Sequence, residues 1–120
     1  MANDFKRFTK ANITTSTGAS ADALYTVASS GSAMASIVIG ITIANTSSSG
    51  VLASVFLDNY DGTNDVYIAK DVSIPAGSSL EIMQGNKLVV EGNGTNNDVI
   101  RVSSNTSNSV DATISLLEDV

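Results

Sequence analysis

Residues 71–94 read DVSIPAGSSLEIMQGNKLVVEGNG, and this stretch decides how the chain is expected to fold. It contains Pro75, the only proline of the chain, and Gly77, a combination that favours a tight turn. Short apolar runs flank the Gly85-Asn86 pair, whose glycine suits the first central position of a two-residue hairpin. We therefore expect a strand, a corner and a hairpin. The residues expected to pair across the hairpin are Leu80, Ile82, Leu88 and Val90.

Short strands and turns continue on both sides of this stretch. In MASIVIGITIAN, residues 34–45, isoleucines recur at a strict period of two, which predicts a strand with one isoleucine face. A Ser-rich loop separates this run from VLASVFLDN, residues 51–59, so we expect the two runs to pair as an antiparallel hairpin. The remaining expected strands cover residues 23–27, 66–74, 80–84, 87–91, 98–104 and 110–118.

About eight short strands with turns at roughly ten-residue spacing are typical of an all-β domain. We predict a single antiparallel β-sandwich or jelly roll over residues 23–120, preceded by an N-terminal arm over residues 1–22. No window shows apolar residues at helical spacing, so little helix is expected.

The N-terminal arm has a composition of its own. It carries three of the six basic residues, whereas residues 11–120 hold 3 basic and 11 acidic residues, a net charge of −8. We interpret it as an arm that docks on an acidic neighbour, such as another copy of the chain. The alternatives are a solvated tail and a helical turn folded back on the domain. The candidate partner-binding residues are Phe5, Lys6, Arg7, Phe8 and Lys10.

The composition excludes several classes of function. Without histidine or cysteine, the chain cannot form Ser-His or Cys-His nucleophilic sites, disulfides or thiolate metal sites. A net charge of −6 argues against nucleic acid as a partner. The N-terminus lacks the apolar core of a secretion signal, and no apolar stretch is long enough to span a bilayer. We therefore expect no enzyme, no catalytic residue, no cofactor and no membrane partner, in a soluble protein made in a cytoplasm.

The segment DNYDGTND, residues 58–65, is rich in potential oxygen ligands. Because calcium prefers oxygen ligands, Asp58, Asp61 and Asp65 form a calcium candidate, although their spacing does not match an EF-hand loop. The alternative is that these residues build turns, which commonly use Asp, Asn and Gly. Glu81 and Glu91 are the carboxylates that flank the Gly-Asn turn, and we expect both to face solvent.

Two long stretches of the chain resemble a module of tailed-bacteriophage virion proteins. They are ALYTVASSGSAMASIVIGITIANTSSSGVLASVFL and YIAKDVSIPAGSSLEIMQGNKLVVEGNGTNNDVIRVSS, and the resemblance spans about residues 23–117. It implies a small β-sandwich structural protein of a phage particle, in particular of phages that infect cyanobacteria. It also implies a decoration (cement) protein or a tail accessory protein.

We carry two classes of function forward. The first is a non-enzymatic virion structural protein, foremost a capsid decoration protein that docks on the shell and stabilises it, with a tail, neck or baseplate accessory protein as the alternative placement. Its partners are then the major capsid protein or tail proteins, and it resides in the virion after assembly in the host cytoplasm. Closed homo-oligomers are the default for such proteins, and the resemblance to decoration proteins favours a trimer.

The second class is a module that binds host-surface glycans or receptors. Such a module needs an aromatic platform or a calcium-bound loop. The tyrosines available for a platform are Tyr25, Tyr60 and Tyr67, of which Tyr60 lies in the acidic segment.

Overall fold

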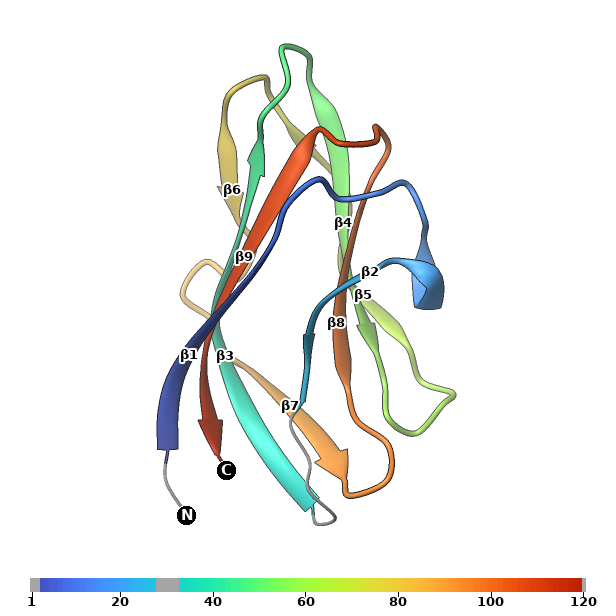
Figure 1. Ribbon diagram of the computed structural model, residues 1–120, viewed down its shortest axis with the longest axis vertical. Helices are drawn as coiled ribbons and strands as arrows, with labels where there is room; N and C mark the ends of the chain where they lie inside the picture. Colours follow the sequence, from blue (N-terminus) through green and yellow to red (C-terminus); the bar gives the residue numbers. More distant parts are fainter. Residues whose placement is uncertain (1–2, 28–32, 120) are drawn as a thin grey trace.

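The computed structural model describes residues 3–27 and 33–119, which form an all-β sandwich of two antiparallel sheets (Figure 1). The prediction of an all-β sandwich is confirmed. The described residues contain one short 3-10 helix, η1 (Gly18–Ser20), and nine strands. The strands are β1 (Asn3–Lys10), β2 (Asp22–Thr26), β3 (Ala33–Asn45), β4 (Val51–Asp58), β5 (Val66–Ile74), β6 (Ser79–Glu81), β7 (Leu88–Asn93), β8 (Val99–Ser104) and β9 (Val110–Asp119).

The two sheets, named sheet A and sheet B here, are built from strands that are distant in sequence. Sheet A has the order β1-β9-β3-β6, and β7 also pairs with β3. Sheet B has the order β2-β8-β4-β5. Their inner faces enclose an aliphatic core that includes Ile41, Ile43, Val55, Ile100 and Ile114, none of which is exposed. No helix in the described part of the chain is long and apolar enough to cross a membrane.

The isoleucines of β3 do not share one face, so the prediction of a single isoleucine face is wrong. The register against β9 shifts between Val38 and Gly40, which places one extra residue, Ile39, in the strand. Beyond a β-bulge of this kind, each side chain points to the face opposite the one that unbroken alternation predicts. Val38 and Ile41 therefore both point inward and are fully buried, whereas Ile39 is 40 % exposed.

The strands β3 and β4 do not form the expected hairpin. They lie in different sheets, because the chain crosses from sheet A to sheet B between them. The buried Asn45 stabilises this crossing, since its side-chain amide donates hydrogen bonds to the carbonyl oxygens of Ser49 (2.8 Å) and Ile74 (2.9 Å). Apolar alternation marks both strands correctly but does not reveal which sheet each one joins.

The expected hairpin around Gly85-Asn86 is also wrong. Strands β6 and β7 do not pair with each other, and both pair with different parts of the long strand β3. The turn between them includes two successive residues with positive φ, Gln84 at 48° and Gly85 at 89°. The segment therefore carries the chain from one position along β3 to another.

Candidate interaction surface

The segment expected to be an arm contains an edge strand of sheet A. Strand β1 pairs with β9 over all eight of its residues without a register shift. It is the end strand of sheet A (Figure 1). Every residue from Asp4 to Lys10 is exposed. The chain that follows it is anchored, because Ile13 is fully buried in the core. The ordered edge of the sheet, and not a helical turn, thus presents the candidate docking residues.

The other sheet edges are poorly suited to pairing with a partner strand. Bulges or similar irregularities interrupt the pairing of β2 and β5 with their neighbours, and β6 is only three residues long. The free side of β7 is partly occupied, since the Glu91 N–H donates to Asp98 Oδ2 and the Asp98 N–H donates to the Glu91 carbonyl, both at 2.8 Å. Irregular, short or covered edges resist pairing with other chains. Among the described strands, β1 is therefore the long, regular edge.

An apolar row crosses the outer face of sheet A and begins on β1. Phe5 faces Leu117 on β9, Leu117 faces Ile37 on β3, and Ile37 faces Val89 on β7. Residues directly opposite one another in antiparallel strands share a face of the sheet. The two residues at the ends of this row are its most exposed members, Phe5 at 80 % and Val89 at 55 %. We call these four residues the apolar row.

The bulge in β3 adds a further apolar group to this face. It turns Ile39 outward, beside a shallow hollow of about 320 Å³ at the surface. Residues of β1, β9 and β3 line the hollow. Its lining residues are Phe5, Lys6, Arg7, Ile39, Ser115 and Leu116.

The structure separates the five candidate docking residues into two groups. Phe5 and Arg7 lie on the outer face, opposite Leu117 and Ser115 of β9. Lys6, Phe8 and Lys10 alternate to the other side, where the Phe8 ring packs 5.0 Å from that of Tyr25. The ion pairs within the described residues are Asp58–Arg101 and Lys70–Asp71, so the three basic residues of β1 remain free for a partner.

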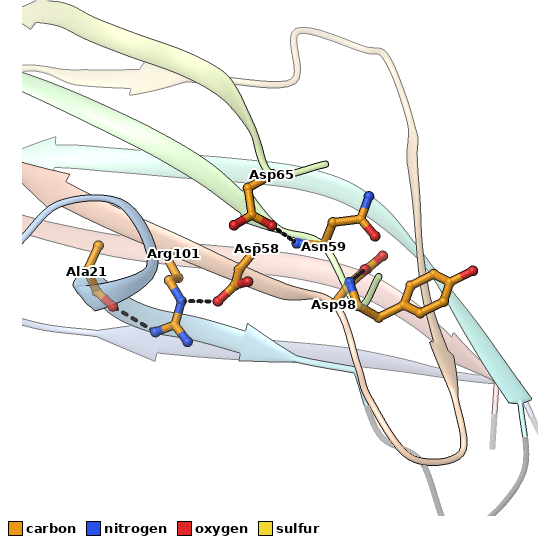
Figure 2. Close-up of polar contacts among 7 residues, drawn as sticks. Ala21, Asp58, Asn59, Asp65, Asp98 and Arg101 are labelled. Atoms are coloured by element: carbon orange, nitrogen blue, oxygen red, sulfur yellow. Dashed lines mark hydrogen bonds and ion pairs between the residues drawn. The ribbon is translucent and has the colours of Figure 1, made fainter. Parts of the chain in front are cut away.

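The aspartates of the calcium candidate serve other purposes, as Figure 2 shows for Asp58 and Asp65. Asp58 forms an ion pair with Arg101 at 3.0 Å. Asp65 accepts a hydrogen bond from the Asn59 N–H at 2.8 Å. Asp61 accepts from the Thr63 and Asn64 N–H groups at 2.8 and 2.9 Å, as in a turn. Within residues 3–27 and 33–119, no group of three acidic side chains is placed to hold a metal ion.

Hydrogen bonds also change the acidity of Asp61. Donation from the backbone N–H groups of Asn64 and Thr63, with a further bond from the Asn64 side chain, lowers its pKa from 3.8 to about 2. Asp61 therefore acts as a turn residue in this segment.

Sequence reasoning missed Asp98, which organises the same region. It is only 4 % exposed, and its carboxylate accepts hydrogen bonds from the N–H groups of Tyr60 and Glu91, both at 2.8 Å. It thereby joins the acidic turn to β7. In the sequence, Asp98 is simply the first residue of the expected strand 98–104, so no local signal distinguishes it.

A second hollow, of about 300 Å³, lies on the outer face of sheet B. Tyr67 lines it and is 40 % exposed, with the Lys70 Nζ 5.3 Å from the centre of its ring. Several hydroxyl and amide side chains complete the wall. Tyr25 cannot serve as a surface platform, because it is only 3 % exposed.

The fold has counterparts among solved virus structures. No family model matches the chain, and no curated protein sequence matches it. A chain in the structure of infectious bursal disease virus, Gx strain, is similar over 96 % of this chain and 32 % of that one, with 15 % identity and a TM-score of 0.50. A chain of the T13 particle of the same virus covers 96 % and 31 %, with 13 % identity and a TM-score of 0.48.

These similarities concern the fold alone. The chain spans about a third of the length of the virus chains that it matches. At such low identity, the likeness shows that this sandwich also occurs in a protein of a virus structure. It does not extend to a phage origin or to a place in a particle.

Proposed function

We propose that the protein is a non-enzymatic structural protein of a virus particle. The observation that carries this proposal is the combination of the regular open edge of β1 with the apolar row beside it. Exposed apolar surface next to an unpaired strand is costly for a lone molecule and is explained by association with another protein. The likeness to a chain of infectious bursal disease virus supports the particle as the place of that association.

Within this role, we favour a capsid decoration protein of a tailed phage. Its docking residues are Phe5, Lys6, Arg7, Phe8 and Lys10, with the major capsid protein as the partner. The charge distribution supports directed docking, since a basic edge on a body of net charge −8 orients the molecule in the field of an acidic surface. The alternative placement is on the tail, neck or baseplate, where tail proteins are the partners.

Mass spectrometry of separated capsids and tails tests this placement. A decoration protein is expected in the capsid fraction, and its loss should lower the temperature at which capsids release their contents. Detection in tails alone would overturn the decoration role, and absence from both fractions would overturn the virion role.

A matched pair of variants tests the docking surface on the particle. Phe5→Asp places a charge on the apolar row and should lower incorporation into particles by about tenfold or more. Val66→Asp is the control, because Val66 is 50 % exposed but lies on β5 of the other sheet. Equal incorporation of the two variants would refute the role of the apolar row.

The hollow beside Tyr67 supports a second candidate function, the binding of host-surface glycans. Sugars pack on exposed aromatic rings and bond to neighbouring polar groups, and Tyr67, Ser103 and Asn105 offer both kinds of group. Binding on a glycan array should disappear with Tyr67→Ala and persist with Tyr60→Ala. If no glycan is bound by the native protein, this candidate is wrong.

A further inference from the structure

The sequence of β1 contains a pattern that complements itself. Two copies of an edge strand can pair in antiparallel fashion about a two-fold axis, which places one residue opposite its own counterpart. For the outer face of the sheet to continue from one copy to the other, odd-numbered residues must face odd-numbered residues and even-numbered residues must face even-numbered ones. Each candidate register of β1 against a second copy is therefore defined by the residue at its centre.

The register centred on Phe5 is the favourable one. It places Asp4 of each copy opposite Lys6 of the other, which gives two pairs of opposite charge. Opposite charges directly across two strands stabilise the pair, and like charges destabilise it. No like charges face each other in this register.

The other registers bring like charges together or gain nothing. Centring on Asp4, Lys6 or Arg7 places that charged residue against its own counterpart. The Arg7 register also forms two Asp4–Lys10 pairs, but it sets Arg7 against Arg7 at the two-fold axis, whereas the Phe5 register has opposite pairs and no like pair. Centring on Phe8 places Lys6 opposite Lys10. Centring on Thr9 creates no pair of opposite charges within the strand. Charge complementarity thus selects the Phe5 register.

The apolar row supports the same register independently. It ends at Phe5, the most exposed large apolar residue of the described chain, on the open edge of sheet A. Pairing Phe5 with Phe5 of a second copy joins the two rows into one that crosses both sheets without a gap. Each ring then covers the other, and offset or edge-to-face contacts between aromatic rings are favourable.

We propose that a second copy of this chain occupies the edge of β1, in an antiparallel two-fold pairing centred on Phe5. The two A sheets become one continuous sheet, and its two joined apolar rows form a single broad docking face. This goes beyond the proposed function, because the pairing requires no other virion protein. It also favours a dimer over the trimer that the sequence resemblance suggested.

A cross-linking experiment on the purified full chain tests the register. The native chain has no cysteine, so Phe5→Cys introduces a single thiol at the centre of the pairing. Directly opposed residues lie within reach of a disulfide, and mild oxidation should convert most of this variant to a covalent dimer. Thr9→Cys is the matched control, since the same register places its two thiols about 27 Å apart.

The two cysteine variants give a decisive comparison. A covalent dimer from Phe5→Cys and little from Thr9→Cys supports the pairing. Equal cross-linking of the two variants, or none from Phe5→Cys, overturns it.

A charge swap tests the two ion pairs by sedimentation. Asp4→Lys or Lys6→Asp alone places like charges across the strands and should weaken the dimer by about tenfold or more. The double variant restores opposite charges and should recover most of the affinity, which a merely structural role for either residue does not predict. Lys87→Asp makes the same change of charge at an exposed residue away from β1 and should leave the affinity unchanged. A monomeric native protein, or failure of the double variant to recover while its circular dichroism is native, overturns the proposal.

Discussion

At the scale of single residues, Glu81 shows how one exposed side chain stabilises an irregular strand. Its Oε2 accepts hydrogen bonds from the N–H groups of Ile41 (2.9 Å) and Met83 (3.1 Å), and its Oε1 accepts one from the Thr42 hydroxyl (3.0 Å). A side chain at Gly40 would meet this carboxylate, because its Cβ would lie 3.2 Å from Oε1. Glu81 therefore satisfies backbone groups next to the bulge, and a Cβ at position 40 would make a tight contact with its carboxylate.

We predict that Glu81→Ala lowers the free energy of unfolding by about 1–3 kcal/mol, because N–H groups near the bulge lose their acceptor. Urea denaturation followed by circular dichroism measures this change. Glu91→Ala is the control, with an expected change within about 0.5 kcal/mol, because Glu91 is also exposed and its carboxylate accepts no hydrogen bond within the described chain. Equal effects of the two substitutions would refute the role of Glu81.

Asp61 provides a prediction about pH. Its pKa is about 2 in the folded chain and 3.8 in the reference state, so the unfolded chain binds the proton more readily. The stabilising effect of the ionised group is therefore present above pH 4 and is lost as the pH falls towards 2. We expect Asp61→Ala to lower the melting temperature at pH 7 and to have a smaller effect at pH 2. A difference that does not change between these pH values would contradict this account.

At the scale of secondary-structure elements, the sequence predicts strands better than it predicts their partners. Alternation and turn residues locate most of the strands, because both are local properties. The partner of each strand depends on where the chain crosses between the sheets, which is not a local property. For this reason the sequence did not reveal that β3 and β4 lie in different sheets or that β6 and β7 both pair with β3. The bulge at Ile39 was also invisible, since the isoleucines alternate without a break in the sequence.

The bulge predicts opposite roles for two neighbouring isoleucines. Ile41→Ala should lower the free energy of unfolding by about 2–5 kcal/mol, because it opens a cavity at a fully buried position. Ile39→Ala should cost less than about 1 kcal/mol, because this side chain is 40 % exposed. Chemical denaturation of both variants measures the difference. Similar losses at the two positions would mean that they share a face, as the strict alternation suggested.

At the scale of the whole molecule, a buried polar cluster joins the two sheets. The Tyr25 hydroxyl, from sheet B, donates a hydrogen bond to Glu118 Oε2 at 2.7 Å and lies 3.0 Å from Ser36 Oγ, and both of these partners belong to sheet A. All three residues are buried. Satisfied polar groups of this kind hold two sheets in a defined orientation.

Tyr25→Phe should lower the free energy of unfolding by about 1–3 kcal/mol, since it leaves a buried carboxylate without its donor. Tyr67→Phe removes a hydroxyl from an exposed ring and should change it by less than about 0.5 kcal/mol. Guanidinium denaturation monitored by tyrosine fluorescence compares the two variants with the native chain. Equal stability of Tyr25→Phe and the native chain would show that the cluster does not stabilise the sandwich.

The candidate interaction surface could be predicted only in part. The unusual composition of the first ten residues pointed to Phe5 and the basic side chains as docking residues, and their role remains a prediction. The apolar row could not be predicted, because it joins four strands whose register is set by the fold. The same holds for the hollow at Ile39, which depends on the bulge.

The position of β9 in sheet A has a consequence for how the protein is made. This strand lies between β1 and β3, so β1 has no neighbouring strand in its sheet until β9, the last strand in sequence order, has been made. Pairing between such distant segments is slow, because a long loop must close before the contacts form. Strand β1 therefore joins sheet A late, after the strands between it and β9 have been made. Strand β3 can pair earlier with β6 and β7, but its β9 side and all of β1 stay open until then, which exposes the newly made chain to aggregation.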